Sequence, residues 1–194
     1  MNRPFDYKNY PVLFVDDEEM SVIGFAEQYN RDFTIFTAQS GNEALDLLQK
    51  HPEIALIITD QRMPGMSGVE LLTQARIIAG EVVRMLITAY TDMDVVVEAI
   101  NKGNVYRYIN KPYNEEDLRF AVMQGIERYF LLRERDRLYA EKVEALKRVS
   151  RANRLTAIGI LAAGMAHEIN NPMVGISTFL QMLPKKRTEP AVDQ

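Results

Sequence analysis

Residues 54–68 read IALIITDQRMPGMSG, an almost wholly apolar run that ends at Asp60 and passes into a turn containing proline and glycine. A short apolar run without alternating polar positions is typical of a central parallel strand, which helices cover on both faces. Proline and glycine favour a tight turn directly after the aspartate. The stretch therefore predicts a buried strand that presents the Asp60 carboxylate at its end.

Similar apolar runs flank this stretch and alternate with amphipathic segments, which predicts βα units around a parallel sheet. Right-handed crossovers then leave few possible arrangements. We expect an α/β, doubly wound, five-stranded parallel sheet. The predicted strands are 12–15, 34–37, 54–59, 83–88 and 106–109, and the predicted helices are 20–30, 41–50, 68–79 and 93–102.

Polar side chains gather at the ends of these strands, where open α/β sheets bind their ligands. They are Asp16, Asp17, Asp60, Thr88 and Lys111. Three neighbouring carboxylates repel one another unless a hard cation lies between them, and Mg²⁺ prefers such oxygen ligands. A cation, an ammonium group and a hydroxyl together would stabilise a phosphoryl group during transfer to a carboxylate. The pattern favours magnesium-dependent phosphorylation of an aspartate.

Four segments in this order resemble the receiver domain of bacterial two-component response regulators. They are VDDEE at 15–19, TDQRMPGMSG at 59–68, LITAY at 86–90 and YRYINKPY at 106–113, and the likeness covers about residues 10–125. The resemblance implies a flavodoxin-like sheet with strand order 2-1-3-4-5. It also implies a cognate histidine kinase or phosphotransfer protein as partner.

The resemblance implies a role for each of these side chains. Asp60 is the expected phospho-acceptor. Magnesium is expected on Asp17, Asp60 and the backbone carbonyl of Arg62, with Asp16 holding it through water. Thr88 and Lys111 are the expected catalytic groups, contacting phosphoryl oxygens, and the bond from Lys111 to Pro112 is expected to be cis. Thr88 and Tyr108 would form a switch, although a half-buried strand aromatic is the alternative for Tyr108.

The chain from Glu115 to Asn170 contains no proline and no cluster of turn residues, which predicts one very long helix. About 55 residues of helix would extend roughly 80 Å. Apolar pairs recur every seven residues from Leu131 and Leu132 onward, so a parallel, dimeric coiled coil is expected, interrupted by Arg135, Lys142 and Asn153. The alternative is a solvated helix lying against its own domain.

His167 lies in LAAGMAHEINNP at 161–172, whereas His51 beside Pro52 is expected to be a surface residue. The segment resembles the H-box of sensor histidine kinases. By that resemblance His167 accepts phosphate, Glu168 is its acid/base partner and Asn171 belongs to a phosphatase motif. The glycine-rich motif of an ATP-binding domain is missing. We therefore do not expect the chain to phosphorylate His167 by itself, and its status as an enzyme stays open.

These expectations divide the chain into a receiver at 1–125, a coiled-coil linker at 126–155, a truncated first helix of the phospho-acceptor region at 156–183 and a polar tail at 184–194. The 194 residues carry a net charge of −4, contain no cysteine and include no run of roughly 20 apolar residues. We expect a cytoplasmic protein without membrane or nucleic-acid binding. A transcription regulator or an interaction module without a kinase role is the alternative.

Overall fold

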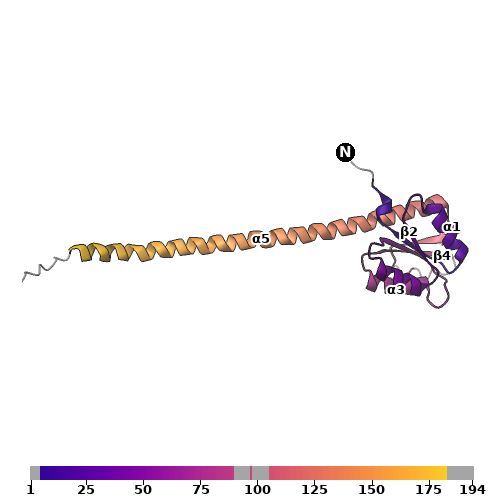
Figure 1. Ribbon diagram of the computed structural model, residues 1–194, viewed down its shortest axis with the longest axis horizontal. Coiled ribbons are helices and arrows are strands. Elements are labelled where there is room, and N and C mark those ends of the chain that lie inside the picture. Colours follow the sequence, from indigo (N-terminus) through magenta and orange to yellow (C-terminus); the bar gives the residue numbers. More distant parts are fainter. Residues whose placement is uncertain (1–4, 90–96, 98–104, 183–194) are drawn as a thin grey trace, which may run out of the picture. The chain divides into compact units, whose positions relative to one another are not determined.

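The computed structural model describes residues 5–89, 97 and 105–182, and beyond Arg151 it describes side chains only at Asn153, Arg154, Ile158 and Met165. Apart from residue 97, the helix predicted at 93–102 lies outside these residues. The elements in chain order (Figure 1) are η1 (Tyr7–Asn9), β1 (Val12–Val15), α1 (Glu19–Tyr29), β2 (Ile35–Ala38), α2 (Gly41–Lys50), β3 (Leu56–Asp60), α3 (Gly68–Ile78), β4 (Val83–Ala89), β5 (Arg107–Lys111) and α5 (Glu115–Met182).

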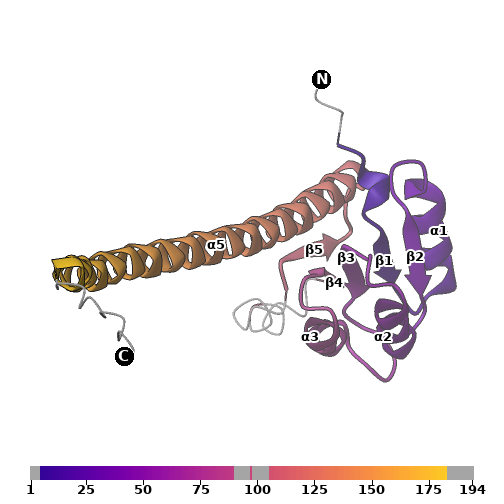
Figure 2. The same cartoon turned by 60° about the vertical axis from the view of Figure 1, so that its left-hand side comes forward.

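The five strands form one parallel sheet in the order β2-β1-β3-β4-β5, which Figure 2 shows side by side. This confirms the predicted doubly wound, flavodoxin-like sheet. The register pairs Val15 with Thr59, and Ala89 with Lys111. The carboxyl ends of β1, β3, β4 and β5 therefore meet at one edge, which we call the acidic edge because Asp16 and Asp60 lie there.

Apolar side chains fill both faces of the sheet because successive strand residues point to opposite sides. Phe14 belongs to the cluster that includes buried side chains of α1 and α5, and Leu13 belongs to the cluster that includes those of α2 and α3. Each fully buried leucine or phenylalanine contributes roughly 1.5–3 kcal/mol. The two cores hold β1 and β3 rigidly in the centre, and so fix the ends from which the polar side chains project.

The turn from β3 into α3 is fixed by local hydrogen bonds. The Ser67 hydroxyl accepts from the Glu70 amide at 3.3 Å, and Glu70 Oε2 accepts from the Ser67 amide at 2.9 Å, forming a capping box. Gly65 has φ +79°, a conformation that favours glycine. The Gly68 amide donates to the Gln61 carbonyl at 3.0 Å. These bonds hold the chain that follows Asp60 in one path.

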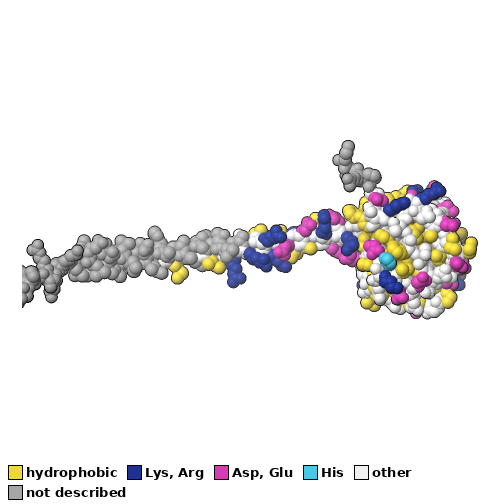
Figure 3. All heavy atoms as spheres, in the orientation of Figure 1, with side chains coloured by type: hydrophobic (Ala, Val, Ile, Leu, Met, Phe, Trp, Pro, Cys, Tyr) yellow, Lys and Arg dark blue, Asp and Glu magenta, His cyan; other side chains and the backbone are white. Residues whose placement is uncertain are grey.

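The chain divides into two compact units, Met1–Arg137 and Leu138–Gln194. In the first unit, buried residues of α5 pack on the sheet, namely Leu118, Ala121, Val122 and Ile126. Acidic and basic side chains intermix along the described part of α5 (Figure 3). No helix within the described ranges is both long and apolar enough to span a bilayer. The predicted domain boundaries and cytoplasmic location remain predictions.

Candidate functional site at the acidic edge

Asp60, the last residue of β3, lies at the centre of the acidic edge with only 8% of its surface exposed. Its Oδ2 accepts the backbone amide of Arg62 at 2.7 Å. Its Oδ1 lies 2.5 Å from the Lys111 ammonium nitrogen. The two contacts fix both carboxylate oxygens, so the side chain is held in one orientation. The role of the Arg62 carbonyl as a magnesium ligand stays a prediction.

Asp16 lies beside Asp60 in the same site. Its Oδ2 is 3.6 Å from the Lys111 ammonium nitrogen, and its Oδ1 accepts the Glu18 amide at 3.0 Å. Burial raises the pKa of Asp16, the Glu18 amide and Lys111 oppose that shift, and the charges of Asp60 and Asp17 add to it. Asp17 itself is exposed. The site therefore concentrates negative charge that calls for a cation.

Lys111 supplies one positive charge to these two carboxylates. Burial alone would lower the pKa of Lys111, but the hydrogen bond and charge of Asp60, together with Asp16, raise it overall. The bond from Lys111 to Pro112 is cis, as the resemblance implied. The Lys111 side chain is 40% exposed, so it stays accessible from solvent while its ammonium group contacts the buried oxygens.

Thr88 and Tyr108 lie on the two adjoining strands. The Thr88 side chain is fully buried, and its hydroxyl donates to the Ala89 carbonyl at 3.1 Å. Tyr108 is partly buried and packs against the core cluster shared with α2 and α3. The structure thus places Thr88 at the carboxyl end of β4 with its hydroxyl bonded to its own strand, and the switch role of both residues stays a prediction.

Magnesium fits the donor set of this edge. Among the described residues, no group of three His, Cys, Asp or Glu side chains could hold an ion by itself. Mg²⁺, however, needs only one or two carboxylates when water and phosphoryl oxygens complete its shell. Two buried carboxylates, Asp16 and Asp60, both reach Lys111 Nζ, and the exposed Asp17 adjoins them. The oxygen ligands and the excess negative charge match a hard cation.

Tyr113 also borders the site, although the sequence pattern predicted no role for it. Burial raises its pKa, Lys111 opposes that shift, and the charges of Asp16 and Asp60 add to it. The sequence did contain a signal for Tyr113, because it ends the segment YRYINKPY two residues after Lys111. Gln61 was not predicted either: its side-chain oxygen accepts the Val69 amide at 3.1 Å and so ties the turn to α3.

The H-box residues lie on α5, whose bounds include His167, Glu168 and Asn171. Their side chains lie outside the described residues.

A hollow of about 480 Å³ lies away from the acidic edge and is lined in part by Pro52, Val82 and Arg133. Because it shares no residue with the acidic edge, it has no part in the chemistry of Asp60.

The fold and the acidic edge define a doubly wound α/β protein with buried carboxylates and a lysine at the carboxyl ends of its strands. A family profile described as the response regulator receiver domain matches residues 12–136. The chain belongs to this family, and those residues are a two-component response regulator receiver domain.

Relatives support this assignment across the same part of the chain. The hydrogenase transcriptional regulatory protein HoxA of Cupriavidus necator is 38% identical over 120 residues, covering 62% of this chain and 25% of HoxA. The sporulation initiation phosphotransferase F of Bacillus subtilis is 31% identical over 116 residues, covering 59% of this chain and 91% of that protein. The chain thus spans only a quarter of the length of HoxA.

Solved structures lead to the same fold. A receiver domain protein from Clostridium thermocellum matches with a TM-score of 0.59 and 28% identity, over 63% of this chain and 98% of that one. A structure described as adenylate cyclase from Rhodopirellula baltica matches with a TM-score of 0.66 and 35% identity, over 67% of this chain and 96% of that one.

Proposed function

We propose that the chain receives a phosphoryl group on Asp60 from a cognate histidine kinase or phosphotransfer protein, in a magnesium-dependent reaction. The observation that carries the proposal is the 2.5 Å contact between Asp60 Oδ1 and Lys111 Nζ beside the buried Asp16. In this contact a carboxylate nucleophile lies next to a cation that can pair with an incoming phosphoryl oxygen.

In the proposed reaction an Asp60 oxygen attacks phosphorus, and the bond from phosphorus to the donor's leaving atom breaks with its electron pair. The product is an aspartyl phosphate. Lys111 pairs with a phosphoryl oxygen, and the Thr88 hydroxyl turns from the Ala89 carbonyl toward another. Asp17, Asp60 and the Arg62 carbonyl would hold Mg²⁺, with Asp16 acting through water. When bound, the ion would neutralise charge on the transferred group.

The test is to incubate the chain with Mg²⁺ and a small phosphodonor and to measure its intact mass. We expect the mass to increase by one phosphoryl group. The increase should not occur when a chelator has removed the metal, because the ion is needed to offset the charge of the transferred group. Unchanged mass in the presence of both reagents would contradict the proposal.

We also propose that α5 pairs with α5 of a second copy as a parallel coiled coil. Four of its described apolar side chains recur at heptad spacing and are more than half exposed, namely Leu131, Leu138, Tyr139 and Leu146. Exposed apolar side chains in such a stripe are stabilised when a partner covers them. We expect the mass measured in solution to be that of a dimer, and a monomer at micromolar concentration would exclude the pairing.

The H-box resemblance supports a second role, in which α5 carries the phospho-accepting His167 of a histidine kinase. The supporting observation is that α5 is one helix from Glu115 through Met182, so the receiver and the H-box segment share a continuous element. The kinase ATP-binding domain would act as a partner. Receivers in transcriptional regulators such as HoxA support the alternative, in which the receiver controls gene expression.

An ATP-binding domain of a histidine kinase, supplied in trans with ATP, tests this second role. We expect acid-labile phosphate on the chain that His167→Gln removes. His51→Gln is the matched control, because His51 is the other histidine in the sequence and pairs with Glu53 at 2.9 Å. Equal labelling of the His167→Gln variant would rule out this histidine as the acceptor.

A further inference from the structure

An aromatic segment precedes the part of the chain that the family profile matches, which begins at residue 12. Tyr7 is the first residue of the short helix η1, and Phe5 and Tyr10 flank that helix. All three are partly buried against the core cluster shared with α1 and α5. Asp6 caps η1 by accepting the Lys8 amide at 3.1 Å. The segment is therefore ordered by its own hydrogen bonds as well as by packing.

The rings of this segment contact α5 where that helix nears the end of the first compact unit. Phe5 packs edge-on against Phe130 with ring centroids 5.4 Å apart, and Tyr10 contacts Phe130 at 6.2 Å and Tyr129 at 6.3 Å. Phe5 also stacks on Tyr10 at 5.2 Å. Edge-to-face and offset pairs of this kind each contribute roughly 0.5–1.5 kcal/mol beyond their buried area.

A polar contact reinforces the packing. The Tyr7 hydroxyl donates to Glu127 Oε1 at 2.6 Å, across 120 positions of sequence. This bond to Glu127 and burial together raise the pKa of Tyr7 to about 12, so the hydroxyl remains a donor throughout the physiological range. The Tyr7 ring also meets Phe33 edge-on at 6.1 Å. Tyr7 thus connects the segment both to α5 and to the loop before β2.

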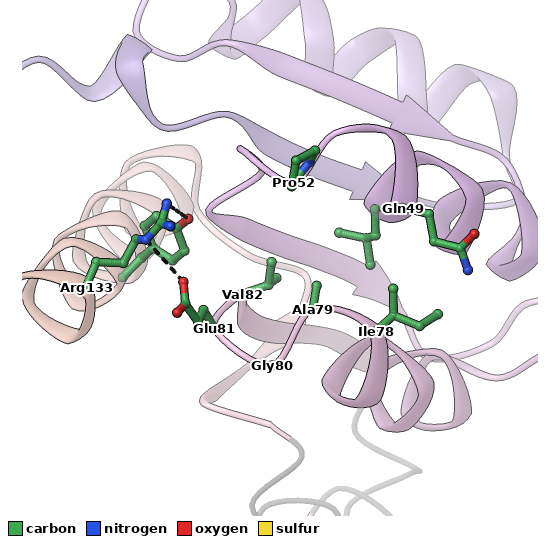
Figure 4. A pocket seen from close by; sticks show the side chains of 10 residues that line it. Gln49, Pro52, Ile78, Ala79, Gly80, Glu81, Val82 and Arg133 are labelled. Atoms are coloured by element: carbon green, nitrogen blue, oxygen red, sulfur yellow. Dashed lines mark hydrogen bonds and ion pairs between the residues drawn. The ribbon is translucent and has the colours of Figure 1, made fainter. Parts of the chain in front are cut away.

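A second anchor holds the next turn of α5. Arg133 Nε lies 3.1 Å from Glu81 Oε2, and Arg133 Nη1 donates to the Tyr129 hydroxyl at 3.0 Å (Figure 4). Glu81 belongs to the turn before β4. Tyr10, Glu81, Phe130 and Arg133 line one shared hollow, so this anchor adjoins the aromatic segment. The N-terminal segment and the β4 turn thus hold neighbouring turns of the same helix.

We propose that the surface formed by Phe33, Glu127, Tyr129 and Phe130 is a docking site for the chain's own N-terminal aromatic segment, and that docking fixes α5 to the receiver as far as Phe130. The inference does not rest on the proposed phosphorylation of Asp60. Anything that displaced the segment would loosen the last anchored turns of α5 while leaving the central strands intact.

Amide hydrogen exchange of the full chain tests the proposal, because exchange reports local opening of a helix. We expect Phe5→Ala to accelerate exchange in residues 126–137 by roughly 2- to 10-fold, in line with the loss of aromatic pairs. Exchange in β3 should be unchanged. Phe120→Ala is the matched control, because Phe120 lies on the same helix but is 64% exposed.

Equal exchange at 126–137 in the Phe5→Ala and Phe120→Ala variants would overturn the proposal. If Phe5→Ala accelerated exchange everywhere, Tyr7→Phe would decide, since it keeps the ring and removes only the hydroxyl that contacts Glu127. Faster exchange confined to the turn around Glu127 would then support docking. Exchange identical to the parent chain in that turn would refute it.

Discussion

Replacing Asp60 by asparagine is expected to abolish the mass increase that a small phosphodonor and Mg²⁺ produce. The amide side chain is not a nucleophile toward phosphorus, so the acyl phosphate bond cannot form. Asparagine also satisfies only one of the two contacts of Asp60, because its nitrogen cannot accept from the Arg62 amide or from Lys111. Intact-mass measurement, repeated with the parent chain, gives the result directly.

Asp46→Asn is the matched control for this experiment. Asp46 is an exposed aspartate on α2, away from the acidic edge, so its variant should gain the same mass as the parent. Phosphate uptake by Asp60→Asn at the parent level would place the acceptor elsewhere. A thermal unfolding curve for each variant tests whether the fold is retained. If it is, the loss of phosphorylation is due to the missing carboxylate.

Replacing Gly68 by alanine is expected to lower the free energy of unfolding by about 1–3 kcal/mol, the usual cost of overpacking. A Cβ at this position would collide with the backbone carbonyl oxygen of Asp60 and lie 2.7 Å from Leu86 Cδ1. Backbone at the end of a central strand has little room to move. The same shift would displace Asp60, so phosphorylation should slow as well, and urea unfolding with mass analysis measures both effects.

Gly24→Ala is the matched control, and it is expected to raise the free energy of unfolding rather than lower it. Gly24 lies inside α1, and a Cβ there would meet nothing within 4 Å. Alanine in a helix interior is more stable than glycine by roughly 0.5–1 kcal/mol. If both alanine variants changed stability in the same direction, close packing of α3 on Asp60 would not explain the role of Gly68.

Strand and helix patterns predicted the sheet because buried parallel strands leave a strong signal in the sequence. The strands ending at Val15, Asp60 and Lys111 lie close to their predicted positions, and α5 begins at Glu115 as predicted. Small differences arise at strand ends: Ile54 and Ala55 are fully buried but precede β3. Ala55 still donates to the Pro11 carbonyl at 2.8 Å and accepts the Val83 amide at 3.0 Å, so the predicted strand is misplaced only at its margin. Motif order was enough to place the acidic side chains at one edge.

Other features depend on contacts between distant residues, which single-residue patterns do not contain. The sequence did not indicate that Lys111 contacts both Asp60 and Asp16, or that the Thr88 hydroxyl bonds to Ala89. The N-terminal aromatic residues were missed because they follow neither strand nor helix periodicity. Their partners, Glu127 to Phe130, lie some 120 positions later in the chain.

Helix α5 supplies core residues to the receiver, such as Leu118 and Ile126, and continues unbroken to Met182. Starting a helix is the unfavourable step, because several residues must be ordered before the first hydrogen bond forms, whereas adding further residues is nearly neutral. Folding of the receiver therefore provides the nucleus from which residues 138–182 can propagate. A peptide of those residues alone would have to nucleate unaided, and the receiver acts as its template.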